Sequence, residues 1–225
     1  MKPRSKRYTK DAEQASEQPV SLDQAVEKLK SFKPTKFDQT VECVLWLGID
    51  PKQADQIIRG SISLPHGVGK QKKVIAFCDE SLVEAAKKAG AIEAGTDELV
   101  KKITDGWSDF DVAVASTKVM GKVGKLGRIL GPQGKMPSPK NGTVTDDVIT
   151  AVAEFTAGKI EFKNDTGGNV HAVVGKISFE KKKLVDNIQA FLSHINRMKP
   201  SSAKGTYIKK MCLSATMSPG VLVSV

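Results

Sequence analysis

Cysteine is scarce in this 225-residue sequence: there are three, Cys43, Cys78 and Cys212, and none belongs to a Cys-x-x-Cys pair. This spacing suggests neither a zinc site nor a disulfide framework, so we expect buried thiols. Long apolar runs are also missing, since none approaches the roughly 18–20 residues that a membrane span requires. The first ten residues lack the apolar segment of a signal peptide. We therefore expect a cytoplasmic protein that does not interact with membranes.

The sequence also lacks the motifs of nucleotide-binding and metal-dependent enzymes. Gly134-Lys135 has neither the upstream glycine nor the following Ser or Thr of a phosphate loop. The segment 67–72 has two glycines but not the third that a dinucleotide fingerprint requires, and it precedes a strand. The histidines stand singly, with no Cys or His nearby at metal-ligand spacing. A nucleotide-binding enzyme is the main competing class, but we expect no enzyme activity, cofactor, metal or small-molecule substrate.

Acidic residues are absent from two long stretches. Residues 112–145 contain six basic side chains and residues 187–225 contain five. The whole chain has 35 Lys and Arg against 25 Asp and Glu, a net charge of +10, and residues 159–225 supply +7 of it, 11 basic minus 4 acidic. Such one-signed fields attract polyanions, because neutralised phosphates release condensed counterions. The charge fits a protein that binds polyanions, and equally a soluble protein that happens to be basic.

Helix and strand signals are clear at both ends of the chain. Residues 1–18 are polar and basic and predict a flexible arm or a loosely docked helix. Ser21 and Gln24 form a capping box that predicts a helix ending near Pro34. A strand is expected at 40–48, covered on both faces because its second face is also partly apolar. The last part of the chain predicts a hairpin of residues 159–165 and 170–179, a helix at 182–197, and two strands within 206–225 hinged at 218–220.

After residue 67, short apolar strands alternate with helical patterns, which indicates a small α/β domain with partly parallel strands. Six glycines and three prolines between residues 121 and 142 exclude regular structure through much of that stretch, which reads as a long basic loop. The expected elements are strands at 74–77 and 111–115 and helices at 80–89, 97–104 and 145–158.

Part of this loop carries a long, irregular motif. It reads Leu126-Gly-Arg-Ile-Leu-Gly-Pro132, then Gly134, Met136-Pro137, Pro139-Lys140 and Gly142-Thr-Val144. The motif resembles the signature of the L-one family of large-subunit ribosomal proteins. Similar segments follow the family order over nearly the whole chain, and only about the first twenty residues fall outside the resemblance. These segments include Lys36-Phe-Asp-Gln-Thr40, Leu47-Gly-Ile-Asp-Pro51, Leu64-Pro-His-Gly67, Gly158-Lys-Ile-Glu-Phe162, Lys204-Gly-Thr-Tyr207 and Thr216-Met217.

The resemblance implies an α/β protein of two domains. Residues 1–67 and 159–225 would form a discontinuous α/β sandwich domain that binds rRNA, and residues 68–158 a smaller, Rossmann-like α/β domain inserted into it. It further implies a ribosome-associated protein of the large ribosomal subunit that binds 23S rRNA and forms the mobile stalk near the exit site. The exit-site tRNA, whose release it would assist, and its own operon mRNA, which it would repress, are the other implied partners. A free-standing RNA-binding translational regulator is the alternative.

The resemblance also implies a set of RNA-contacting residues. Lysines would meet phosphates, Phe37 and Met217 would contact ribose and base faces, and Thr40 and Thr216 would bond 2′-hydroxyls. The rRNA- and mRNA-binding set is Glu27, Lys36, Phe37, Thr40, His171, Lys176, Thr216, Met217, Ser218 and Gly220. A basic loop near tRNA would comprise Lys118, Lys122, Lys125, Arg128, Lys135 and Lys140.

Several of these residues have simpler interpretations. Taken alone, Phe37 fits the core equally well, and His171 within a strand fits a structural role. Glu27 fits a solvated charge, unless it accepts from a 2′-hydroxyl or fixes a lysine. Ser218 stands where the family usually has glycine, and a side chain there would crowd a backbone that approaches RNA closely.

Overall fold

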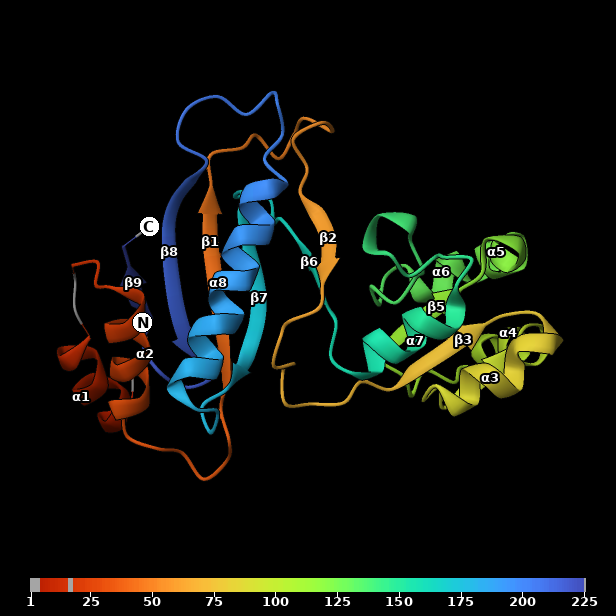
Figure 1. Cartoon of the computed structure of the whole chain (residues 1–225), viewed down its shortest axis with the longest axis horizontal. Coiled ribbons are helices and arrows are strands. Elements are labelled where there is room, and N and C mark those ends of the chain that lie inside the picture. Colours follow the sequence, from red (N-terminus) through yellow and green to blue (C-terminus); the bar gives the residue numbers. More distant parts are fainter. Residues whose placement is uncertain (1–4, 16–17, 225) are drawn as a thin grey trace. The chain divides into compact units, whose positions relative to one another are not determined.

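The computed structural model describes residues 5–15 and 18–224, and these divide into two compact units. Unit 1 contains the chain up to Gly69 together with the chain from Ile160 onward, and unit 2 is Lys70–Lys159. Figure 1 labels the elements of both units. The predicted domain boundaries, at 67/68 and 158/159, lie within two residues of this division.

Unit 1 is built around a four-stranded antiparallel sheet with the order β7-β1-β8-β9. Its strands are β1 (Thr40–Leu47), β7 (Asn169–Lys176), β8 (Ile208–Ala215) and β9 (Val221–Val223). In Figure 1 the orange β1 runs between the cyan β7 and the blue β8, and it pairs with both. A strand from the first fifth of the chain is therefore the centre of a sheet whose other strands come from the last quarter.

Helices α2 (Leu22–Ser31) and α8 (Lys181–Arg197) pack on one face of this sheet, and α1 (Lys6–Gln14) precedes them. The predicted capping box is present, because the Ser21 side chain accepts from the Gln24 backbone and the Gln24 side chain accepts from the Ser21 backbone. Every second residue of β1, from Val41 to Leu47, is buried in the core beneath these helices. The predicted helix ending near Pro34, strand at 40–48 and helix at 182–197 are thus confirmed, with bounds that differ by a few residues at most.

The expectation that β1 is covered on both faces is wrong. The burial of β1 alternates, and the ring of Trp46 on the second face is 38% exposed. The amines of Lys209 and Lys210 lie 4.9 and 5.7 Å from the centre of this ring, so basic side chains rather than a helix accompany the apolar residues there. The alternation of apolar residues correctly predicted the strand. The apolar side chains Val44 and Trp46 on its second face do not belong to the buried core.

The predicted hairpin of residues 159–165 and 170–179 is also wrong, because these two segments do not pair along their length. Strand β6 (Ile160–Lys163) pairs with β2 (Arg59–Ile62) in a separate antiparallel sheet, and a single bridge, Asn164 to Val170, connects it to β7. The turn itself forms as expected, with Gly168 at φ +76°, a conformation that glycine adopts without steric cost. The partner of β6 is therefore β2, which lies about 100 residues earlier in the sequence, and not the segment that directly follows β6.

Unit 2 is a three-layered α/β structure around a parallel sheet with the order β4-β3-β5. Alternate residues of β3 and β5 face two different cores, one covered by α3 and α7 and the other by α4 and the segment 117–130. The parallel strands and the predicted helices are confirmed. The bounds are β3 (Val74–Phe77), η1 (Glu80–Leu82), α3 (Val83–Lys88), β4 (Glu93–Gly95), α4 (Asp97–Thr104), β5 (Val112–Ala115) and α7 (Val148–Thr156).

The glycine-rich stretch is more regular than its sequence predicts. Its elements are η2 (Thr117–Val119), α5 (Met120–Val123), η3 (Gly124–Leu126), α6 (Gly127–Leu130) and η4 (Pro139–Asn141). Val119, Val123, Leu126 and Leu130 recur at helical spacing and are all buried. Their burial offsets the loss of backbone entropy that glycine incurs in a helix, about 0.5–1 kcal/mol at each position. The exclusion of regular structure from residues 121–142 was therefore wrong for residues 121–130.

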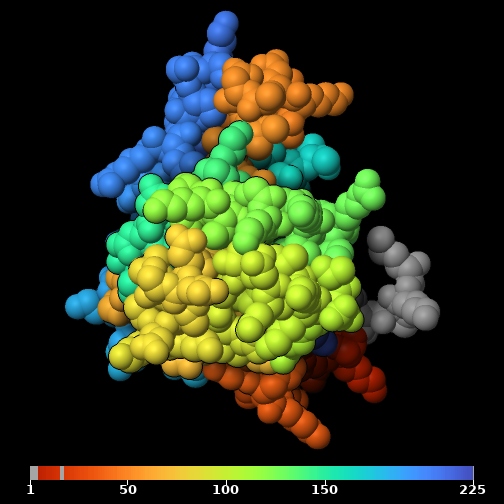
Figure 2. Space-filling model, turned by 90° about the vertical axis from the view of Figure 1, so that its right-hand side faces the viewer, coloured from red at the N-terminus to blue at the C-terminus, as the bar shows by residue number. Residues whose placement is uncertain are grey.

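Figure 2 shows one face of unit 2, where the yellow and green segments that include α3 and α4 form a continuous surface. Among residues 5–15 and 18–224, no helix is both long and apolar enough to cross a membrane. The thiols of Cys43 and Cys78 are buried as expected, whereas Cys212 is half-buried, and all three are free.

Candidate nucleic-acid interface

Five of the predicted contact residues meet where β1 begins and β7 and β8 end. Thr40 lies opposite Lys176 in the ladder, and the Lys176 amine donates to the Thr40 hydroxyl at 2.8 Å. The backbone N–H of Thr40 donates to the hydroxyl of Thr216 at 3.1 Å. Met217 and Ser218 follow directly in the turn between β8 and β9. We call Thr40, Lys176, Thr216, Met217 and Ser218 the strand-end cluster.

Two large apolar side chains stand exposed at this end of the sheet. Met217 and Phe37 are each 52% exposed, which excludes the interpretation of Phe37 as a core residue. Phe37 lies in the loop between α2 and β1, where the Thr35 hydroxyl donates to its carbonyl at 2.8 Å. Lys36, beside it, is exposed. The amine, hydroxyl and apolar groups that the sequence predicted for RNA contact are therefore accessible in one region.

Gln39 holds the turn that carries Met217, although it is not in the predicted set. It is 4% exposed, and its side-chain oxygen accepts from the backbone N–H of Met217 at 3.0 Å. Its carbonyl accepts from Ile177 N–H at 2.9 Å, so it connects the residues after β7 to the β8–β9 turn. Gln39 lies inside the matched segment 36–40. The family resemblance did not imply an RNA contact for Gln39, and its role here depends on a bond to a residue 178 positions away.

Ser218 bonds within its own turn. Its hydroxyl accepts from the backbone N–H of Ala215 at 2.9 Å, and its own N–H donates to the Ala215 carbonyl at 3.0 Å. The side chain thus closes the turn. Gly220 is exposed, but a Cβ there would lie 2.7 Å from the sulfur of Cys212, so this position requires glycine for packing between β8 and β9.

Glu27 and His171 lie outside the strand-end cluster. Glu27 is on α2, and its carboxylate accepts from the amine of Lys181 at 2.6 Å, which makes it a residue that fixes a lysine. The hydrogen bond that Lys181 donates to Glu27 is the main reason that the pKa of Lys181 is raised, so this amine stays charged. His171 pairs with Val44, four residues along β1 from Thr40, roughly 14 Å away at strand spacing. Its ring is exposed and lies 3.8 Å from Asp165.

The six basic residues predicted near tRNA have different surroundings within unit 2. Lys122 pairs with Asp97 at 3.0 Å, and Lys135 donates to the Ser108 carbonyl at 2.9 Å. In the part of the chain that the structure describes, the other four make no ion pair and are exposed on η2, η3, α6 and η4: Lys118, Lys125, Arg128 and Lys140. Within the described ranges, only the charge of Lys122 is therefore compensated by an acidic side chain, and four of the other five basic residues are exposed.

The described residues contain no group of three His, Cys, Asp or Glu side chains arranged to hold a metal ion. Amines and hydroxyls beside exposed apolar side chains are the chemistry with which proteins contact phosphates, 2′-hydroxyls and bases. This arrangement is therefore typical of the class of RNA-binding proteins.

Comparison with known proteins identifies the family. Residues 29–219 match the model of the Ribosomal protein L1p/L10e family, and the chain belongs to this family. Three similar proteins are named large ribosomal subunit protein uL1. That of Rhodopirellula baltica is 56% identical over 221 residues, covering 98% of both chains. That of Chlorobaculum tepidum is 50% identical over 206 residues, covering 92% of this chain and 89% of the relative. That of Thermobifida fusca is 49% identical over 221 residues, covering 98% and 94%.

These matches confirm the resemblance drawn from the motif around residues 126–144. They also separate this chain from the competing class of nucleotide-binding enzymes, because the matched family is one of ribosomal proteins.

Proposed function

We propose that this protein is a structural constituent of the large ribosomal subunit and binds 23S rRNA directly through unit 1. The strand-end cluster, with Lys36 and Phe37, is the contact surface. The observation that supports this most strongly is the hydrogen-bonded row from Lys176 through Thr40 to Thr216, flanked by two half-exposed apolar side chains. The row fixes an amine and two hydroxyls in advance, so that little side-chain entropy is lost on binding.

The first experiment measures binding of the full-length protein to a fragment of large-subunit rRNA, with Met217→Ala as the test variant. We expect affinity to fall by about tenfold, because this exposed side chain would lose its contact with a base or ribose face. Ile92→Ala is the matched control, since Ile92 is a similarly exposed apolar residue, 48%, in unit 2. Equal effects of the two substitutions, or no effect of either, would contradict the contact surface.

Binding to the protein's own operon mRNA is part of the same proposal, because one surface would serve both RNAs. Met217→Ala should then weaken the mRNA complex together with the rRNA complex. A variant that lost only one of the two affinities would refute the shared surface.

We further propose that unit 2 contributes to the mobile stalk near the exit site, where its four exposed, unpaired basic residues would approach deacylated tRNA and assist its release. Neutralising Lys118 and Lys125 together should slow tRNA release from purified ribosomes while rRNA affinity stays unchanged. Lys122→Gln is a suitable control, because Asp97 already compensates that charge.

A free-standing translational regulator would bind RNA equally well, so affinity alone does not exclude it. Sedimentation separates the two: a ribosomal constituent remains with large subunits in high salt, and a free regulator does not. A nucleotide-binding enzyme would instead gain thermal stability from added nucleotide, and we expect no shift.

A further inference from the structure

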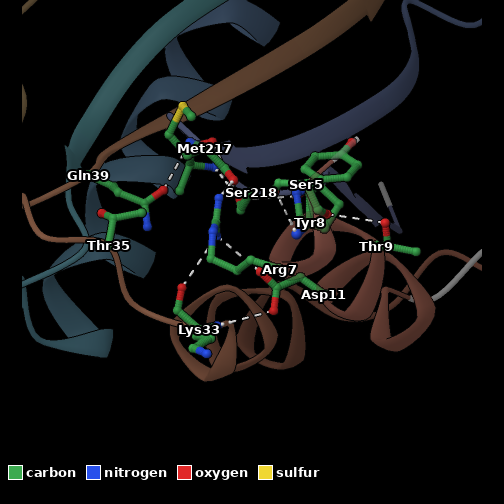
Figure 3. A network of polar contacts seen from close by, with 12 residues as sticks. Ser5, Arg7, Tyr8, Thr9, Asp11, Lys33, Thr35, Gln39, Met217 and Ser218 are labelled. Atoms are coloured by element: carbon green, nitrogen blue, oxygen red, sulfur yellow. Dashed lines mark hydrogen bonds and ion pairs between the residues drawn. The ribbon is translucent and has the colours of Figure 1, made fainter. Parts of the chain in front are cut away.

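Helix α1 lies outside both the predicted site and the segments that carry the family resemblance, yet it contacts the turn that bears Met217. Figure 3 shows the Arg7 side chain reaching from α1 toward Met217 and Lys33. One terminal nitrogen of Arg7 donates to the Met217 carbonyl. The other donates to the Lys33 carbonyl at 3.4 Å and to the Asp11 carboxylate at 3.1 Å. One guanidinium therefore connects α1 to two loops.

Asp11, on the same helix, bonds both Arg7 and Lys33. It is 4% exposed, the most deeply buried carboxylate among the described residues, and one of its oxygens pairs with Arg7. Its second oxygen accepts from the backbone N–H of Lys33 at 3.3 Å. A buried carboxylate without partners is strongly unfavourable, so the ion pair with Arg7 and the hydrogen bond from Lys33 N–H stabilise Asp11 in this position.

The two loops held by Arg7 are the ones that present the proposed RNA contacts. Lys33 begins the loop that leads to Lys36 and Phe37, and Met217 belongs to the strand-end cluster. With Gln39 accepting from the Met217 N–H and Arg7 donating to its carbonyl, both polar backbone groups of Met217 are occupied. The exposed thioether is then the part of Met217 left to meet a ligand.

We propose that Arg7 is a positioning residue for RNA binding, and that α1 sets the relative placement of the two contact loops. Arg7 acts through Met217 and does not itself touch phosphate. Its side chain is 21% exposed, and both terminal nitrogens bond within the protein. This inference rests on the proposed RNA-binding function.

The test compares Arg7→Ala, Arg7→Lys and Lys10→Ala in the full-length protein with the same rRNA fragment. Lys10 is the matched control, because it removes one positive charge from the same helix at an exposed position. We expect Arg7→Ala to weaken binding by about tenfold, because the variant loses the charge-assisted hydrogen bonds that hold the two contact loops. Arg7→Lys should restore part of this affinity, since an amine can reach one of the two carbonyls, and Lys10→Ala should change it less than about twofold.

Two further readouts separate positioning from direct contact or general stability. The slope of log affinity against log salt should be the same in Arg7→Ala and the wild type, whereas loss of a phosphate contact would reduce it by about 0.7–0.9. The double variant Arg7→Ala/Met217→Ala should lose less affinity than the sum of the two single losses, because part of the Arg7 effect is transmitted through Met217. Hydrogen exchange at the Met217 amide should accelerate in Arg7→Ala while exchange at Leu45, in β1, does not.

Additive losses in the double variant, or a reduced salt slope, would overturn the positioning role. So would wild-type affinity of Arg7→Ala. In each of these cases Met217→Ala still reports on the proposed function separately. If Met217→Ala binds like the wild type, the contact surface itself is wrong, whatever Arg7 does.

Discussion

At the scale of single residues, the backbone of the β8–β9 turn is fixed by side chains from three directions. Gln39 accepts from the Met217 N–H, Arg7 donates to its carbonyl, and the Ser218 hydroxyl closes the turn onto Ala215. The family resemblance predicted Met217 and Ser218 as RNA contacts. It did not find Gln39 and Arg7, since their contribution depends on pairing across 178 and 210 residues of chain, which no local pattern encodes.

Ser218→Gly tests whether the serine side chain opposes or supports the turn. The substitution removes the hydroxyl that accepts from Ala215 N–H, so we expect the free energy of unfolding to fall by about 0.5–1.5 kcal/mol. RNA affinity should not improve, because the hydroxyl is engaged with the backbone of its own turn. Urea unfolding and rRNA binding measure the two effects. Tighter binding by the glycine variant would indicate that Ser218 crowds the RNA after all.

At the scale of elements, the sequence predicted strands and helices best where one periodicity is undisturbed. α4 at 97–104 and β3 at 74–77 have the predicted bounds because a single apolar pattern runs through each. The segment 117–130 was missed because glycine frequency was weighted above the buried positions Val119 to Leu130. The partner of β6 could not be predicted either, since strand pairing over about 100 residues depends on tertiary packing.

Gly121→Ala should stabilise unit 2. Gly121 lies inside α5 without positive φ, and a Cβ there would have no neighbour within 4 Å, so alanine gains helix propensity without a clash. We expect a gain of about 0.5–1 kcal/mol in the free energy of unfolding. Trp107 reports on unit 2 by fluorescence in a Trp46→Phe background.

Gly175→Ala, in contrast to Gly121→Ala, should destabilise the protein. Gly175 has φ +153°, and its Cβ would lie 2.9 Å from Leu184, so we expect a loss of roughly 1–3 kcal/mol in unit 1. Trp46 reports on that unit. Equal effects of the two substitutions would show that glycine content, not local geometry, determines the response.

His194 on α8 should make unit 1 sensitive to mild acid. Its pKa is lowered from the ordinary 6.5, first by burial and then by the positive charge of Arg197. The unfolded chain therefore binds this proton more readily than the folded one, so the contribution to stability is present above pH 6.5 and decreases as pH falls below it. His194→Gln should reduce the slope of unfolding free energy against pH between about 5 and 7. Parallel slopes for variant and wild type would contradict this assignment.

At the scale of the whole molecule, each unit has its own hydrophobic core. The core of unit 1 contains residues up to Val68 and from Ile160 onward, and the two cores of unit 2 contain only residues between Val74 and Phe155. No buried cluster among the described residues draws on both units. Independent folding of each unit is the expected consequence.

Removing residues 70–159 and joining Gly69 to Ile160 with a short Gly-Ser linker tests which unit binds rRNA. We expect the remnant to fold, because its core is complete, and to retain rRNA affinity within a few-fold, because the strand-end cluster and α1 are intact. Circular dichroism and thermal unfolding establish that the remnant is folded before binding is measured. A folded remnant with little affinity would assign the main contacts to unit 2.

The central position of β1 has a consequence for how the protein is made. Both neighbours of β1 are translated late, at residues 169–176 and 208–215, whereas every strand of the parallel sheet is complete by residue 115. During translation, unit 2 therefore finishes folding first. Until β7 and β8 have been made, both edges of β1 are unpaired. The proposed contact surface forms only after residues 208–218 have been made and β8 has paired with β1, so a shorter nascent chain lacks this surface.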